Sequence, residues 1–474
     1  MGALFYLENL AALLVVFARS DNNHSMRLLY SISASMDSCF LITVFVFAFS
    51  LSNGERTLKF VTVGNGTLEG KLQFECHSKL LLSMQPLLSN EQQLYRHGDR
   101  SPLDTYPTDP YKENDWPQGF GQLSQEGKKQ QYELGQFLKK RYRGFLSENY
   151  NRKEIYIRSV DLDRTLMSAE ANLAAMFPPS SSEEFIPGLK WQPIPVHTVP
   201  EDKDLLLHFP LRNCPRYIQL MNETKNSDIF HKMTVTYKAF IEMVRIKTGK
   251  KTVSVDSVWT VYDTLFCESK HGKVLPDWVT PDVMETLKVL NDFSYQIMFG
   301  VYERKEKSRL QGGLLLDQII KNISSAAASD NEQKTKMIVY SAHDTTIVAL
   351  QEALDVFSGL QPPYASCHLI ELHQEENGMF SVEMFYRNDS AVEPYAVSLP
   401  GCSQRCPLQD FVKRTRDVIP QDWNKECEIK KEATDTSKDA VKCITSIRHI
   451  FRSTLDDCLK GKDIHFSVSA HPLY

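Results

Sequence analysis

The sequence predicts an α/β fold: an open, mostly parallel β-sheet flanked by helices, with a smaller helical cap domain inserted into it. Three apolar runs predict strands, at 58–63, 154–158 and 336–340. Each run leads into polar residues at its carboxyl end, the edge where ligands bind in an open α/β sheet. Between residues 180 and 302, helical segments and proline-rich connections replace the strand signal, which indicates the cap.

The elements between and after these strands follow from local signals. Residues 124–142 predict a helix, because Ser124 can cap its start and Lys139, Lys140 and Arg141 complement the helix dipole at its end. A hairpin is predicted around Asn377-Gly378, a favoured two-residue turn. Further helices are expected at 168–177, 228–248, 280–299 and 345–354, and the hairpin strands at 366–373 and 379–387.

Two polar motifs carry the chemical signal. The first, Arg96-His97-Gly98-Asp99-Arg100-Ser101-Pro102, places a potential nucleophile between two guanidinium groups, with a glycine that lets the backbone approach a ligand. The second, Ser341-Ala342-His343-Asp344-Thr345-Thr346, places a carboxyl group beside a histidine at the end of a strand. Arginine binds tetrahedral oxyanions bidentately, neutral imidazole can attack phosphorus, and aspartic acid can protonate a leaving oxygen. Together the motifs indicate phosphate-ester chemistry.

With Tyr156-Ile157-Arg158-Ser159, these motifs resemble the three signatures of the histidine acid phosphatase family, especially the animal prostatic and lysosomal acid phosphatases. The resemblance runs from about residue 58 to residue 427. It implies hydrolysis of phosphate monoesters through a phosphohistidine, without a cofactor. It also implies that His97 is the nucleophile and Asp344 the proton donor, and that the phosphate is held by Arg96, Arg100, Arg158 and His343. No metal-binding pattern is evident in the sequence, and the arginines already supply positive charge.

The two catalytic groups impose opposite protonation requirements. Neighbouring arginines lower the pKa of His97 and keep it neutral, whereas Asp344 must be protonated to act as the acid. Both conditions together predict an acid optimum at roughly pH 5, between the reference values for Asp and His.

Composition and the N-terminal region predict a secretory-pathway protein. The 54 basic and 59 acidic residues are nearly balanced and form no basic tract, which argues against nucleic-acid binding. The apolar run Cys39–Ser50 is too short to span a bilayer and has the length of a signal-peptide core, although an uncleaved anchor is the alternative. The part before Met26 would then be upstream extension. No apolar run of about 20 residues follows Cys402, so we expect no membrane anchor and a secreted or lysosomal product.

Cysteines in an oxidising compartment tend to pair, but spacing alone brings only Cys402 and Cys406 together. The resemblance implies three bonds: Cys214–Cys427, Cys267–Cys367 and Cys402–Cys406. Four sequons predict glycans on exposed loops, at Asn65, Asn222, Asn322 and Asn388.

One segment departs from the family pattern. In relatives the first strand runs directly into the Arg-His-Gly loop, whereas here residues 64–93 separate Val63 from Leu94. Either this insertion loops out while Gln93-Leu94-Tyr95 completes the strand, or the strand is misplaced and the protein is catalytically impaired. The expected organisation is a leader (1–52), a phosphatase domain (53–427) with the 64–93 insertion and the 180–302 cap, and a poorly ordered polar tail (428–474).

The substrate class follows from the resemblance and from the cap. The family includes broad phosphomonoesterases, phytases, and enzymes that act on phosphopeptides or lysophospholipids, and it admits a homodimer. A phytase would need extra basic residues around its pocket, whereas the cap shows only a short run at Lys250-Lys251. We therefore expect small phosphate monoesters and a broad substrate range.

Overall fold

The computed structural model describes residues 87–211, 213–328 and 335–429, together with the backbone of four strands between residues 15 and 62. The chain divides into two units, 1–85 and 86–474, each with its own internal contacts. In these described parts, no helix combines the length and hydrophobicity that a membrane span requires. The predicted tail lies outside the described residues, apart from 428 and 429.

The first unit contains two antiparallel strand pairs. Strand β1 (Val15–Asp21) pairs with β2 (Ser25–Ser31), and β3 (Phe45–Ser52) pairs with β4 (Glu55–Thr62). The expected strand at 58–63 is therefore present as β4, but its partner is β3 rather than the large sheet. The compact unit that carries the phosphatase motifs begins at residue 86, not at residue 53.

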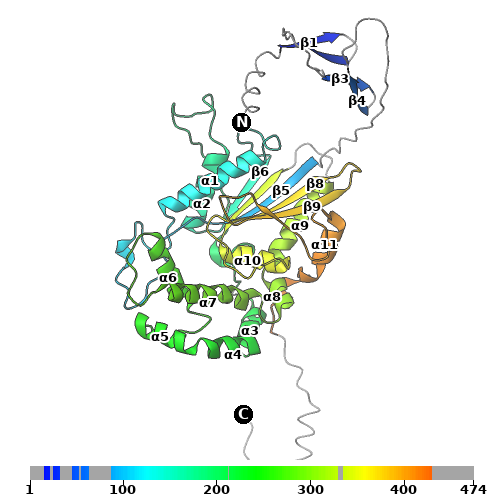
Figure 1. The fold of residues 1–474 in the computed structure, drawn as a ribbon. Helices are drawn as coiled ribbons and strands as arrows, with labels where there is room; N and C mark the ends of the chain where they lie inside the picture. The colour runs from blue at the N-terminus through cyan, green and yellow to red at the C-terminus, as the bar shows by residue number, and fades with distance from the viewer. Residues whose placement is uncertain are drawn as a thin grey trace, which may run out of the picture. The chain divides into compact units, whose positions relative to one another are not determined.

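The second unit is built on a seven-stranded sheet in the order β10-β9-β8-β5-β7-β6, with β11 paired to β9 (Figure 1). Strand β5 pairs in parallel with β7, and β7 with β6, whereas the other pairs are antiparallel. The α/β class is confirmed, but the sheet is mixed, because the β8–β9 hairpin extends it with antiparallel strands. The strands are β5 (Leu87–Arg96), β6 (Ile155–Ser159), β7 (Met337–Ala342), β8 (Cys367–Gln374), β9 (Phe380–Arg387), β10 (Tyr395–Val397) and β11 (Cys406–Pro407).

Helices cover both faces of this sheet and form the cap. The sheet-flanking and C-terminal helices are α1 (Gln125–Arg141), α2 (Asp163–Met176), α8 (Arg304–Leu310), α9 (Gly313–Ala328), α10 (Asp344–Ala353), α11 (Leu408–Thr415) and α12 (Trp423–Glu426). The cap helices are α3 (Pro215–Thr224), α4 (Asp228–Thr236), α5 (Lys238–Thr248), α6 (Trp259–Lys270) and α7 (Pro281–Phe299). Figure 1 shows α4 to α7 grouped away from the sheet.

Strand alternation sorts the buried side chains into separate cores. Tyr95 and Ile157 pack with Leu134 and Leu173 of α1 and α2 on one face. Leu94, the next residue along β5, belongs to the core on the other face, which α9 and α10 cover. The cap has its own core, formed mainly by α6 and α7, with Val261, Leu265, Leu287, Leu290 and Phe293 among its members.

Most predicted helices are found where expected. The Ser124 hydroxyl accepts a hydrogen bond from the Gly127 amide at 2.9 Å and caps α1, as its position predicts. The helix expected at 228–248 is divided into α4 and α5 at Tyr237, after a Thr-Val-Thr run whose β-branched side chains favour helix less. Helix α2 starts at Asp163, five residues earlier than expected.

Strand β5 shows how the 64–93 insertion affects the central sheet. Its first seven residues, 87–93, come from the insertion, and its last three lead into the Arg-His-Gly motif. Tyr95 lies opposite Ser341 of β7 and Cys367 of β8, so the strand occupies the centre of the sheet. Gln93-Leu94-Tyr95 completes the strand, as in the first expected outcome, but the described part of the insertion lies in the strand and does not loop out. In addition, the insertion supplies the strand residues before them.

The inserted half of β5 places polar side chains in the core. Asn90, Glu91, Gln92 and Gln93 are each at most 2% exposed. Gln92 Nε2 donates to Asn90 at 2.6 Å, but neither carboxyl oxygen of Glu91 makes a hydrogen bond of normal geometry to a described residue. The Tyr142 hydroxyl is close enough to lower the pKa of Glu91, but it donates to Glu371 at 2.9 Å. Burial, and Glu371 directly opposite on β8, raise the pKa of Glu91 well above its usual value. An unpaired buried polar group of this kind costs about 1–3 kcal/mol.

We therefore expect Glu91→Val to raise the free energy of unfolding by about 1–3 kcal/mol at pH 7, measured by denaturant unfolding. Because the pKa is raised in the folded state, the wild type loses stability as pH rises above the unfolded value near 4.5. The gain from Glu91→Val should therefore be larger at pH 7 than at pH 4.5.

The matched control is Gln92→Val in the same strand. Gln92 donates to Asn90 at 2.6 Å and accepts from Asn322 at 3.0 Å, so removing its amide takes one hydrogen bond away from each of these two side chains. This variant should not be stabilised. A loss of stability in Glu91→Val would show instead that its carboxyl group makes a favourable native interaction.

Candidate active site

The two polar motifs meet at one edge of the sheet. Arg96 at the end of β5 lies opposite Ala342 at the end of β7, and the two strands are parallel. The next residue on each strand is a histidine, and the rings of His97 and His343 are 5.4 Å apart. The backbone amide of His97 donates to the Ala342 carbonyl at 2.9 Å, which fixes this alignment. The motifs, far apart in the chain, are thus brought together as the sequence predicted.

One nitrogen of the His97 ring is hydrogen-bonded to the backbone, and the other keeps a lone pair for attack. Nδ1 lies 2.8 Å from the Gly98 carbonyl oxygen, which can only accept, so Nδ1 carries the proton. Nε2 therefore keeps its lone pair. Burial lowers the pKa of His97 well below its usual value, and the charges of Arg164, Arg96 and Arg100 and the nearby His343 lower it further. The neutral imidazole that nucleophilic attack requires is favoured even in acid.

Gly98 allows close packing of the loop at 96–102 against α1. A Cβ at this position would overlap the backbone of Gly127 in α1. The Gly98 amide donates to Ser168 of α2 at 3.2 Å. The absence of a side chain at Gly98 thus brings the loop at 96–102, hereafter the signature loop, into contact with the helices behind it.

The two arginines of the signature loop are held by carboxylates. Arg96 Nη2 lies 2.8 Å from Asp344 Oδ2, and its guanidinium stacks 4.2 Å from the ring centre of Tyr364. Arg100 forms a two-point pair with Asp263 of the cap helix α6, at 2.9 and 3.2 Å. Each guanidinium is thereby fixed within the site.

The third arginine of the site is Arg164, not Arg158. Arg164 lies in the first turn of α2, and its charge lowers the pKa of both His97 and His343. Burial and the neighbouring Arg100 lower the pKa of Arg164 itself to about 10. A signal for it exists in the sequence: Arg164 opens the helix after β6, just as Asp344 opens the helix after β7.

Arg158 is engaged elsewhere. It pairs with Asp204 at 2.5 Å on the edge strand β6, and it is not among the main causes of the pKa shifts of the two site histidines. It lines a cavity of about 360 Å³ together with Tyr156, Gln318, Asn322 and Tyr340. Along β6, Ile155 and Ile157 point toward α1 and α2, so alternation turns Arg158 to the other face.

Four buried donor atoms in the site have no hydrogen-bond partner among the described residues. These are Nε of Arg96, Arg100 and Arg164, and Nε2 of His343. A tetrahedral oxyanion offers the acceptors that such donors bind, and three of the four belong to cationic guanidinium groups.

Asp344 is ionised in the free protein. Its Oδ2 accepts from Tyr295 at 2.9 Å and from Gln361 at 3.2 Å, beside the Arg96 pair. Burial by itself would raise the pKa of Asp344, but Arg96, His343, Arg100 and the Tyr295 hydroxyl outweigh it and lower the pKa to about 2. The expectation of a protonated Asp344 at pH 5 therefore does not hold for the free protein. Tyr295 and Gln361 were not identified from the sequence.

Two of the three expected disulfides are present, Cys214–Cys427 and Cys402–Cys406. Cys267 and Cys367 are instead buried free thiols, so the third expected bond is absent from the structure. Cys267 Sγ lies 3.7 Å from both Arg100 and the Tyr364 hydroxyl, whereas Cys367 packs against the α1–α2 core.

The sequons occupy different environments. Asn222 is exposed in α3 and Asn388 is exposed after β9, whereas Asn65 lies outside the described residues. Asn322 is half-buried in α9 rather than on an exposed loop, and its Nδ2 donates to Gln92 and Tyr340, each at 3.0 Å. That amide is not free to carry a glycan in this structure.

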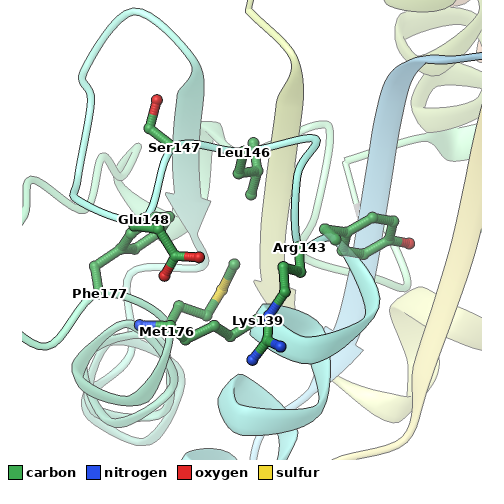
Figure 2. A pocket seen from close by; sticks show the side chains of 8 residues that line it. Lys139, Arg143, Leu146, Ser147, Glu148, Met176 and Phe177 are labelled. Carbon is green, nitrogen blue, oxygen red and sulfur yellow. The ribbon is translucent and has the colours of Figure 1, made fainter. Parts of the chain in front are cut away.

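A second hollow lies outside this site. Figure 2 shows a pocket between the C-terminal ends of α1 and α2, lined by Lys139, Tyr142, Arg143, Leu146, Ser147, Glu148, Met176 and Phe177. None of these residues belongs to the cluster around His97. The pocket is therefore separate from the phosphate-ester chemistry that the two motifs indicate.

Among the residues that the structure describes, Glu371, His373 and Glu383 on β8 and β9 form a group with the types and spacing of metal ligands. Arg141 pairs with Glu371 at 2.7 Å, and Arg405 pairs with Glu383 at the same distance. These two carboxylates already have cationic partners, so the group is balanced without an ion.

Comparison with known proteins agrees with this geometry. Residues 88–387 match the family described as the histidine phosphatase superfamily (branch 2). The lysosomal acid phosphatase of Homo sapiens is 56% identical over 343 residues, covering 72% of this chain and 81% of that protein. The prostatic acid phosphatase of Homo sapiens is 52% identical over 335 residues, covering 70% and 86%.

Among solved structures, the apo phytase of Hafnia alvei matches with a TM-score of 0.55 and 16% identity, covering 73% of this chain and 98% of that one. The phytase of Citrobacter braakii matches with a TM-score of 0.53, 16% identity and coverages of 73% and 100%. These two likenesses concern the fold alone. Because the family match spans more than half of the chain and two acid phosphatases exceed 50% identity over most of it, this protein belongs to branch 2 of the histidine phosphatase superfamily.

Proposed function

We propose that this protein is an acid phosphatase that hydrolyses phosphate monoesters through a phosphohistidine formed at His97. The observation that carries the proposal is a neutral imidazole with Nε2 available, surrounded by Arg96, Arg100 and Arg164. Phosphoryl transfer needs positioning and positive charge around the phosphoryl oxygens, and this arrangement supplies both.

The reaction divides into two displacements. In the first, His97 Nε2 forms a bond to phosphorus while the bond from phosphorus to the ester oxygen breaks, and the leaving oxygen takes a proton from Asp344. In the second, water attacks phosphorus, gives a proton to Asp344, and the N–P bond breaks to release phosphate. Arg96, Arg100, Arg164 and His343 bind the phosphoryl oxygens throughout.

The low pKa of Asp344 requires a source for the first proton. We assign it to the substrate, because the monoanion of a phosphate monoester still carries a proton, which it loses with a pKa of about 6. Bound phosphate also draws Arg96 away from Asp344 and places negative charge beside it, and both effects raise the affinity of the carboxylate for that proton. The acid optimum then originates in the substrate and not in Asp344 of the free protein.

The remaining assignments rest on the family relationship. Small phosphate monoesters are the substrates we propose first, with phosphopeptides and lysophospholipids as further candidates. The relatives named lysosomal and prostatic acid phosphatase support a location in the secretory pathway or the lysosomal lumen, and glycans at Asn222 and Asn388 fit that location. An impaired protein, the alternative raised by the insertion, gains no support from β5, whose register keeps His97 beside His343.

The first test is His97→Ala in protein from a secretory host. It should abolish hydrolysis of an aryl phosphate at pH 5 and remove the acid-labile phosphoprotein that rapid quenching traps in the wild type. Lys251→Ala, at an exposed position of the cap, serves as the control and should behave as wild type. Full activity of His97→Ala would overturn the proposal.

The second test compares two arginines. Arg164→Gln should lower kcat/KM by about 100-fold, because it removes a charged donor from the transition state. Arg158→Gln breaks only the pair with Asp204 and should change kcat/KM far less. If Arg158→Gln lowered kcat/KM more than Arg164→Gln, Arg158 and not Arg164 would be assigned to the phosphate.

The third test concerns the origin of the acid optimum. Above the second pKa of the substrate, the monoanion fraction falls about tenfold for each pH unit, and kcat/KM should fall with it. Two aryl phosphates with different second pKa values should therefore give descending limbs displaced by that difference. Identical limbs would show that a group of the protein titrates instead.

A further inference from the structure

The cap helix α6 presents one face to the signature loop. Asp263, Cys267 and His271 are spaced four residues apart at the helix and its C-cap, so they lie on the same side. Asp263 and Cys267 contact Arg100, and His271 Nε2 lies 2.8 Å from Asp99 Oδ2. The cap thus holds the loop at several points.

Asp263 controls the orientation of Arg100. Its two oxygens accept from both Nη atoms of Arg100, and its Oδ2 also accepts from the Leu103 amide at 3.0 Å. Both side chains are largely buried, at 5% and 12% exposure, so no solvent competes strongly for this pair. With both Nη atoms engaged, Nε is the donor of Arg100 without a partner among the described residues.

The charges of the site explain why such an anchor is needed. Arg96, Arg100 and Arg164 are buried close enough to alter one another's pKa, and they repel one another. Asp344 accompanies Arg96, and Asp263 accompanies Arg100. Without Asp263, Arg100 would turn away from the other cations, and its Nε would leave the position that faces a phosphoryl oxygen.

We propose that Asp263, on helix α6 of the cap, is a positioning residue that fixes Arg100 for binding of the phosphoryl group, with His271 as a second tie to the same loop. This inference rests on the proposed function, since it assigns Arg100 to the phosphoryl oxygens. It makes the cap part of the phosphate site rather than a cover over it.

The test is a double-mutant cycle on the full chain, with Asp263→Asn, Arg100→Gln and the double variant. The measurements are affinity for inorganic phosphate by calorimetry, kcat and KM for an aryl phosphate, and the melting temperature. Asp263→Asn should weaken phosphate binding and kcat/KM by about 10- to 100-fold, as expected for a displaced binding group. Because Asp263 acts through Arg100, adding Asp263→Asn to Arg100→Gln should change either quantity by less than about twofold.

Asp256→Asn is the matched control, because it breaks a cap ion pair with Lys225, at 2.8 Å, that does not touch the signature loop. It should leave phosphate affinity and kcat/KM unchanged. If Asp263→Asn does not fold, Asp263→Glu, which keeps the charge but lengthens the side chain, takes its place in the cycle.

Unchanged phosphate affinity in the folded Asp263 variant, or effects of the two substitutions that multiply in the double variant, would overturn the inference. A lowered melting temperature with unchanged phosphate affinity would show a purely structural role and would overturn it as well. If the wild type binds phosphate but does not hydrolyse esters, the proposed function fails, and the phosphate affinities still decide the role of Asp263.

Discussion

The parallel pairing of β5 with β7 is the constraint on which the site depends. Arg96 opposite Ala342 places His97 beside His343, with Asp344 one residue further on. A slip of one residue would turn every side chain of β5 to the opposite face of the sheet. The catalytic geometry is therefore a property of strand register, and the helices that follow β6 and β7 add Arg164 and Asp344 at the same edge.

The arginines at this edge of the sheet affect the protonation of both His97 and Asp344. The arginines lower the pKa of His97, which keeps the nucleophile neutral, and they also lower the pKa of Asp344. The first effect favours attack on phosphorus, whereas the second deprives the free protein of its acid. In the mechanism that we propose, an incoming phosphate monoanion resolves this conflict, since it neutralises the arginines and brings a proton. Catalysis and substrate protonation are then coupled through the same electrostatic field.

The central strand β5 also shows that backbone hydrogen bonding outweighs side-chain hydrophobicity at this position of the sheet. Residues 90–93 are polar, yet they occupy a position buried on both sides. The backbone of residues 91–93 is paired with β7 on one side and β8 on the other, and Asn90 is paired with β8, so most of the backbone cost of burial is met. Side-chain partners satisfy Asn90 and Gln92, whereas both carboxyl oxygens of Glu91 and the amide oxygen of Gln93 have no hydrogen-bond partner among the described residues. Because its backbone is paired, the polar segment 90–93 can occupy a buried strand that hydrophobic patterning alone would not predict.

Local signals in the chain were enough to predict the elements and the chemistry, because caps, turns and periodicity act over a few residues. Ser124 at the start of α1, the Asn377-Gly378 turn between β8 and β9, and the two motifs around His97 and Asp344 are of this kind. Three-dimensional packing was needed to show which segment enters the sheet before the signature loop. The apolar run of β4 fits a strand pattern, but β4 pairs with β3, and β5 occupies the place in the sheet. Packing also places Arg164 in the site instead of Arg158, sets Gly98 against α1, and keeps Asp344 ionised. These outcomes depend on distances between residues far apart in the chain, which local pattern does not contain.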